Sequence, residues 1–225
     1  MLNALASLGG SFAKIDTHYH IIPEIYKEAV EKAGGDPSGF GTPENWTPEN
    51  AIKFMNESGI RKAYVSVTSP GVPIAPAAEQ RALARKLNEF SAYELRDKYP
   101  ARFGVFGNLP DLTDVEGTLA EIDHCAHVLK VDGFVVFTSY GKEHKYLGDD
   151  QFIPIWKKFN DLESVVFIHP SCGVAGMINK LLPLPISDYP HETCRAAADL
   201  VTSGRKRQFP QTKIILRMAA ELSRS

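Results

Sequence analysis

The stretch Lys14-Ile15-Asp16-Thr17-His18-Tyr19-His20 decides how the rest of the chain is interpreted. It predicts a short β-strand, placed at residues 13–18, that ends in two histidines two positions apart. Because side chains alternate along a strand, His18 and His20 are expected on the same face. Two neighbouring imidazoles are a suitable start for a divalent metal site. An isolated pair of this kind is often incidental, so the prediction depends on the rest of the sequence.

A third histidine lies in a similar context. The stretch Ser164-Val165-Val166-Phe167-Ile168-His169-Pro170 is a continuous run of β-branched and aromatic residues before Pro170. Such a run predicts a strand buried on both faces, which His169 ends and the proline stops. In a parallel α/β barrel, the carboxyl ends of all strands meet at one end of the barrel, so histidines at these positions can together bind a metal ion there. We therefore predict that His18, His20 and His169 are metal ligands.

Strand and helix patterns alternate along the chain, which is typical of βα units and a parallel sheet. A helix is expected from Pro48 to Gly59, because Thr47 is a favoured N-cap residue and proline is favoured at the first helical position. A loop is expected over 34–48. The other predicted strands are 61–68, 102–108, 133–138, 164–169 and 213–216, and the other predicted helices are 75–99, 113–128, 151–162 and 191–203.

Composition limits the function classes. The 225 residues include 23% charged residues and carry a net charge of −2, as in an ordinary globular protein. We expect one domain over 1–225, with no electrostatic basis for binding nucleic acid and no segment for spanning a membrane. Cys125, Cys172 and Cys194 share no spacing typical of metal ligands, so reduced thiols in a cytoplasmic protein are expected.

The first strand with its two histidines, followed by the His169-Pro170 pair, resembles the amidohydrolase superfamily. Within it, the chain is most similar to the metal-dependent decarboxylases, such as aminocarboxymuconate-semialdehyde decarboxylase. Three further segments resemble the fungal 6-methylsalicylate decarboxylase group: Gly35-Asp36-Pro37-Ser38-Gly39, Ser69-Pro70-Gly71-Val72 and Asp188-Tyr189-Pro190-His191-Glu192-Thr193. The resemblance implies an α/β fold of the (β/α)8 TIM-barrel type, here truncated to about six βα units. It extends from about residue 12 to Leu216.

The resemblance also implies a reaction and a set of ligands. The family chemistry is non-oxidative decarboxylation of a small aromatic carboxylic acid such as 6-methylsalicylate, with a divalent metal, zinc or alternatively manganese. Trp46 and Phe40 are candidates for contacts with the aromatic ring, although packing explains each of them equally well. Asp16 either approaches the metal or makes a structural hydrogen bond. A homodimer is an arrangement that the family suggests.

The carboxyl end departs from the family pattern. The resembled decarboxylases have a histidine after the sixth strand, where this chain has Met218, and an aspartate ligand at an eighth strand. Residues 217–225 look like an out-of-frame tail, because one set of codons for the family motif Ser-His-Gly-Gly-Gly-Thr-Leu-Pro, read one nucleotide later, encodes the sequence from Arg217 to Arg224. We hypothesise that this tail replaces the motif, and we expect an incomplete barrel with impaired activity. Two other functions stay open. One is a metal-dependent hydrolase of the same superfamily, and the other is an inactive truncated barrel.

Overall fold

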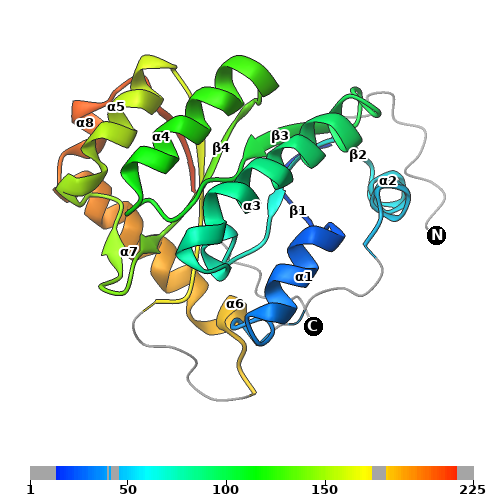
Figure 1. The fold of residues 1–225 in the computed structure, drawn as a ribbon, viewed down its shortest axis with the longest axis horizontal. Helices are drawn as coiled ribbons and strands as arrows, with labels where there is room; N and C mark the ends of the chain where they lie inside the picture. The colour runs from blue at the N-terminus through cyan, green and yellow to red at the C-terminus, as the bar shows by residue number, and fades with distance from the viewer. Residues whose placement is uncertain (1–13, 40, 42–45, 174–180, 217–225) are drawn as a thin grey trace, which may run out of the picture.

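The computed structural model describes residues 14–39, 41, 46–173 and 181–216, and Figure 1 shows its fold. Six parallel strands form one sheet in the order β1-β2-β3-β4-β7-β8. The strands are β1 Lys14–Ile21, β2 Ile60–Val67, β3 Phe103–Gly107, β4 Gly133–Phe137, β7 Val165–His169 and β8 Lys213–Leu216. Their order in space follows their order in the chain, as in a βα barrel. In the described residues, β1 and β8 are the outer strands and each pairs with a single neighbour.

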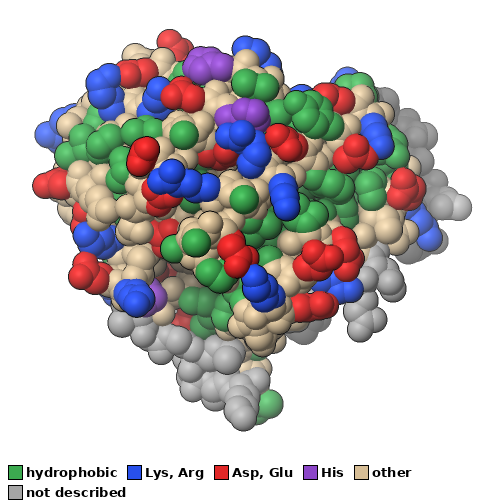
Figure 2. All heavy atoms as spheres, viewed as in Figure 1, with side chains coloured by type: hydrophobic (Ala, Val, Ile, Leu, Met, Phe, Trp, Pro, Cys, Tyr) green, Lys and Arg blue, Asp and Glu red, His purple; other side chains and the backbone are tan. Residues whose placement is uncertain are grey.

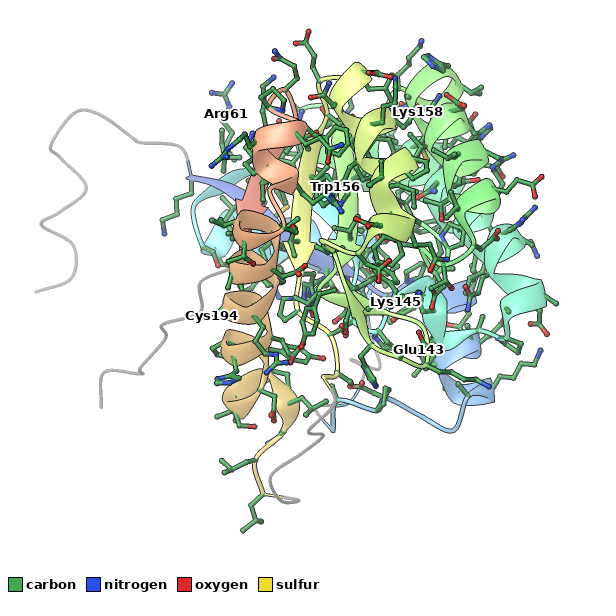
Figure 3. The ribbon with its side chains drawn as sticks, turned by 90° about the vertical axis from the view of Figure 1, so that its left-hand side faces the viewer. Arg61, Glu143, Lys145, Trp156, Lys158 and Cys194 are labelled. Atoms are coloured by element: carbon green, nitrogen blue, oxygen red, sulfur yellow. The ribbon has the colours of Figure 1, made fainter. Side chains whose placement is uncertain are left out.

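Helices connect the strands. They are α1 Glu24–Lys32, α2 Pro48–Glu57, α3 Ala77–Glu89, α4 Val115–His124, α5 Ile153–Asp161, α6 Leu184–Ser187, α7 Tyr189–Thr202 and α8 Arg205–Gln208. Two of them begin at a capping side chain. The Thr47 side chain accepts a hydrogen bond from the Asn50 N–H at the start of α2, and Asp114 does the same for the Gly117 N–H at the start of α4. Figures 1 and 3 show the helices packed along the outside of the sheet.

Two helices change their geometry before the next strand. Helix α3 continues as a π-helical segment over Phe90–Arg96, and α4 continues in the same way over Cys125–Leu129. The second segment ends at Lys130, whose φ of 55° places it in the left-handed region. A residue in this conformation commonly stops a helix and turns the chain. Both segments lie outside the sheet and far along the chain from His18, His20 and His169.

The apolar core has separate parts on the two sides of the sheet. One cluster between sheet and helices surrounds β1 and β2 and includes Tyr26, Val65 and Leu87. A second lies around β4, β7 and α5 and includes Trp156, whose Nε1 donates a hydrogen bond to the Leu147 carbonyl. The third is a small cluster of Phe106, Val135 and Phe167, against which the partly buried Tyr64, Val165 and Ile215 pack. These aromatic residues lie on the inner side of the sheet, toward which the histidines also point.

The surface carries charges of both signs. On the face that Figure 2 shows, Lys and Arg side chains are interspersed with Asp and Glu. Many of these are paired, for example Lys158 with Asp123 and Arg81 with Asp114. Among the helices of the described residues, none has the length and apolar character needed to cross a membrane.

The fold prediction is confirmed, with corrections to individual elements. All six predicted strands are present and their bounds differ by at most two residues, except that β1 runs to Ile21 and therefore contains both histidines instead of ending at them. Helix α1 was not predicted, nor was the two-stranded hairpin of β5 Ser139–Tyr140 and β6 Lys145–Tyr146. The hairpin lies in the loop after β4, where Figure 3 labels Lys145 and Glu143. The predicted out-of-frame tail, 217–225, lies outside the described residues.

Candidate metal centre

Three histidines from the two predicted strands converge on one point. His20 Nε2 lies 2.9 Å from His18 Nε2 and 3.1 Å from His169 Nε2. The three side chains each offer one ligand atom, and these atoms all lie within 4.8 Å of one another. The pairing of β1 with β2, and of β7 with β4, brings residues 149 positions apart to the same end of the sheet. The sequence therefore identified a real cluster, and its role in metal binding stays a prediction.

His169 is held in a defined orientation. Its side chain is buried, with 1% of its surface exposed, and its Nδ1 lies 2.6 Å from the Pro170 carbonyl oxygen. A carbonyl only accepts hydrogen bonds, so Nδ1 carries the proton and donates it. The Nε2 lone pair is then left facing the other two histidines. This arrangement, in which a backbone carbonyl fixes the tautomer of a ligating imidazole, is common around metal ions.

A β-bulge in β1 positions His18. Asp16 pairs with Ala63 and Tyr19 pairs with Val65, so β1 has one more residue than β2 in this interval. Within the bulge, the Asp16 carboxylate accepts a hydrogen bond from the His18 N–H at 2.9 Å. Bulges are frequent where a strand must turn a side chain toward a functional site. Asp16 therefore makes the structural hydrogen bond that was one of its two predicted roles, and its approach to a metal stays a prediction.

The spacing of the nitrogens fits a single divalent ion. A zinc ion binds imidazole nitrogen at about 2.0–2.1 Å, so two such nitrogens lie about 3.0 Å apart at a 90° angle and about 3.4 Å apart at the tetrahedral angle. The observed distances of 2.9 and 3.1 Å are close to the first value. Three neutral imidazoles are also the donor type that zinc and other transition metals prefer. The residues therefore fit a divalent metal, with further coordination positions open to other groups.

Aromatic side chains surround the cluster. The rings of Phe167 and His18 have centroids 5.1 Å apart, and the Phe137 ring lies 5.7 Å from that of His169. On another side, the Tyr189 ring lies 6.0 Å from the His169 ring in an edge-to-face arrangement. Burial raises the pKa of the Tyr189 hydroxyl to about 12. The tyrosine is therefore protonated at neutral pH and available as a hydrogen-bond donor.

A cavity of about 780 Å³ lies next to the cluster. Its lining comes from the first turns of α3 and from the ends of β2, β3, β4 and β7 with the loops that follow them, and it includes Pro70, Asp111, Phe137, Tyr140, Ser171 and Cys172. The three histidines are not among its lining residues, but Phe137 is, and its ring lies 5.7 Å from that of His169. The cavity is large enough for a small aromatic molecule.

The remaining predicted residues lie elsewhere. Trp46 is half-buried and packs against Phe90 at a centroid distance of 6.3 Å, within the core cluster around β1 and β2. Its contact with a substrate stays a prediction. Phe40 and Met218 lie outside the described residues. Sequence reasoning missed Phe137, although its position at the end of β4 on the inner face would have indicated it.

The comparisons with known proteins agree with this geometry. The amidohydrolase family model matches residues 15–217. This chain belongs to the amidohydrolase family. It is 44% identical over 206 residues to the 6-methylsalicylic acid decarboxylase of Penicillium expansum, covering 91% of this chain and 63% of that protein. A decarboxylase of Aspergillus niger is 42% identical over 214 residues, covering 90% of this chain and 57% of that protein. The chain thus spans less than two thirds of the length of these curated relatives.

Solved structures support the fold assignment. A crystallised amidohydrolase superposes with a TM-score of 0.82 at 24% identity, covering 91% of this chain and 66% of that one. A dihydroxybenzoic acid decarboxylase from Polaromonas superposes with a TM-score of 0.76 at 24% identity, covering 91% and 64%, and was crystallised with manganese and 2-nitroresorcinol. At this level of identity the likeness establishes the amidohydrolase barrel fold, of which the described sheet has six strands.

Proposed function

We propose that this protein is a metal-dependent, non-oxidative decarboxylase of a small aromatic acid such as 6-methylsalicylate. The observation that carries the proposal is the convergence of His18, His20 and His169 at one end of a parallel half-barrel. The identity of 44% to a fungal 6-methylsalicylic acid decarboxylase, over nearly the whole chain, supports the reaction and the substrate class.

The proposed reaction needs no oxidant and no second substrate. A proton adds to the ring carbon that bears the carboxylate, the bond from that carbon to the carboxylate carbon breaks, and its electron pair restores the aromatic ring as CO2 leaves. When bound, a divalent metal would supply positive charge that holds the oxygen atoms of the acid. Zinc is the metal that we propose for three imidazole ligands, and manganese is the alternative.

The chain's own residues prepare the site in two ways. His169 is fixed by its Nδ1 hydrogen bond to the Pro170 carbonyl, so that its Nε2 needs no reorganisation before it binds a metal. The rings of Phe137 and Phe167 lie beside the histidines and exclude water from part of the site. Exclusion of water strengthens the electrostatic interactions that hold a charged substrate. A proton donor is not assigned among the described residues.

The experiment compares two proteins, the 225-residue chain and a version with the reading frame restored after Leu216. Each is loaded with zinc or manganese and incubated with 6-methylsalicylate, and release of CO2 is followed, with a chelator-treated sample as the control. Metal-dependent release by either protein supports the proposal. Release by the frame-restored version alone also supports the proposed frame change. If neither protein releases CO2 but either hydrolyses esters or lactones, the hydrolase alternative replaces the proposal.

Location and assembly are proposed on other grounds. Cys125, Cys172 and Cys194 are all free thiols, which supports a reducing compartment such as the cytoplasm. A homodimer, expected from the family resemblance, is tested by light scattering of the metal-loaded protein at several concentrations.

A further inference from the structure

Three loops that are distant in sequence meet beside the candidate metal centre. The Tyr26 hydroxyl donates to the Thr68 carbonyl at 2.8 Å and accepts from the Gly71 N–H at 3.1 Å, which fixes the loop after β2. The Leu184 N–H donates to the Ser38 carbonyl at 3.1 Å and joins the start of α6 to the loop after α1. The side chains of Ser38, Ser69 and Tyr189 are drawn together at this junction.

This junction buries more hydroxyl groups than it satisfies. The exposed fractions are 4% for Ser38, 3% for Ser69 and 3% for Tyr189. Ser69 and Ser38 both lie near Tyr189, since hydrogen-bonding contacts with these two serines lower the pKa of Tyr189 against the larger effect of burial. Yet neither Ser69 Oγ nor Tyr189 Oη has a partner in hydrogen-bond geometry among the described residues. Buried hydroxyls are normally hydrogen-bonded, so an unsatisfied pair in one place calls for a ligand.

The position of the pair points to the nature of that ligand. The Tyr189 ring packs edge-to-face on the His169 ring, at 6.0 Å between centroids, and Ser69 follows the carboxyl end of β2. Both residues therefore lie at the end of the sheet where the three histidines converge. A phenol and a serine hydroxyl can both donate to an oxygen anion. No arginine occurs between Ile21 and Ile60, so the early loops offer a carboxylate no guanidinium partner.

We propose that Tyr189 Oη and Ser69 Oγ donate hydrogen bonds to the carboxylate of the aromatic acid and so position it beside the histidine cluster. This inference rests on the proposed function and deepens it, because it assigns a recognition role to two residues outside the metal ligands. Tyr189 and Ser69 are positioning residues, and the proton that enters the ring comes from elsewhere. Their donor hydroxyls select an acid over the phenol that decarboxylation produces.

The test measures binding instead of turnover. The zinc-loaded chain, with metal content verified, is titrated with 6-methylsalicylate and, separately, with 3-methylphenol, which has the same ring substituents without the carboxylate. Tyr189→Phe is expected to weaken binding of the acid on the order of 10-fold or more, because a hydrogen bond to a charged group is lost. Binding of the phenol should change by less than about twofold. Ser69→Ala should show the same selectivity with a smaller loss.

Two controls separate a recognition role from a structural one. Tyr93→Phe makes the same chemical change at an exposed position on the outer helices and should leave both affinities unchanged. Metal content and the unfolding temperature of Tyr189→Phe should equal those of the unchanged chain. Suppose that the unchanged chain binds the acid. This inference fails, while the proposed function stands, if Tyr189→Phe and Ser69→Ala bind the acid as well as the unchanged chain does, or if they lose affinity for the acid and for the phenol to the same extent. If the unchanged, metal-loaded chain binds no aromatic acid, both fail.

Discussion

Replacing His20 by alanine should abolish most of the stabilisation that a divalent metal gives to the fold. His20 is the central member of the cluster, since its Nε2 is 2.9 Å from that of His18 and 3.1 Å from that of His169. At a metal concentration 100 times the Kd, binding stabilises a folded protein by about 2.7 kcal/mol. For a chain of this size, that corresponds to a rise in Tm of about 5–10 °C.

The loss in the variant follows from the same relation. Removing a group that only supports a ligand costs about 10–100-fold in metal affinity, so removing the central ligand should cost at least about 100-fold. At the same metal concentration, the remaining stabilisation is then about 0.4 kcal/mol, or a rise in Tm of about 1–2 °C. Thermal unfolding followed by circular dichroism, with and without zinc or manganese, measures both values.

A matched substitution shows whether the effect belongs to the cluster. His127 is an exposed histidine near the end of α4 that lies 3.6 Å from Asp123, far along the chain from the three converging imidazoles. His127→Ala should keep the full rise in Tm with metal. A His20→Ala variant that still gains about 5 °C or more would refute the assignment of the site, because the metal would then bind elsewhere.

Three further predictions concern other parts of the chain. Asp114→Ala should lower the free energy of unfolding by about 1–2 kcal/mol in urea titrations, since it removes both the cap of α4 and a surface ion pair with Arg81. Arg81 holds the pKa of Asp114 below its ordinary value of 3.8, so the loss of unfolding free energy in Asp114→Ala should be complete above about pH 4 and should shrink as the pH falls further. An equal loss at pH 2 and pH 6 would contradict this. Gly71→Ala should destabilise the fold by about 1–3 kcal/mol, because Gly71 has a φ of +72° and a Cβ there would lie 2.2 Å from the Phe137 ring. It should also weaken metal binding, because the Phe137 ring packs on His169. Unchanged unfolding and metal affinity would rule out a coupling between Gly71 and the histidine cluster. Alkylation of the native chain should modify exposed Cys194 first and Cys125 last, because burial raises the pKa of the Cys125 thiol, and mass spectrometry of the digested protein would detect the reverse order.

The sheet could be predicted from the sequence because its strands are buried and uninterrupted. The run that became β4 is apolar from end to end, that of β7 is apolar up to its final residue His169, and Pro170 marks where β7 stops. The hairpin of β5 and β6 could not be found in this way, since two-residue strands show no periodicity. Helix α1 was overlooked although Pro23 stands at its N-terminus and Glu24 in its first turn.

The histidine cluster could be predicted because its members lie at matching positions of parallel strands. What surrounds the cluster could not. The approach of Tyr189 to His169 joins the beginning of α7 to the end of β7, and the segment between them has no regular pattern that would place it. The position of Trp46 against Phe90 likewise depends on how a loop packs on a helix. Such contacts are decided by tertiary packing and not by local periodicity.

The bulge in β1 divides that strand into two halves with opposite phase. Before it, Asp16 stands opposite Ala63, on the side of the sheet that the helices cover; after it, His20 stands opposite Ser66, and the alternation is shifted by one residue. A hydropathy pattern drawn continuously through the strand would assign one half to the wrong side. Anyone transplanting this histidine pair into another scaffold must therefore carry Asp16 and Thr17 with it. Without these two residues, the strand would be regular and the bulge would no longer set the orientation of the two histidines.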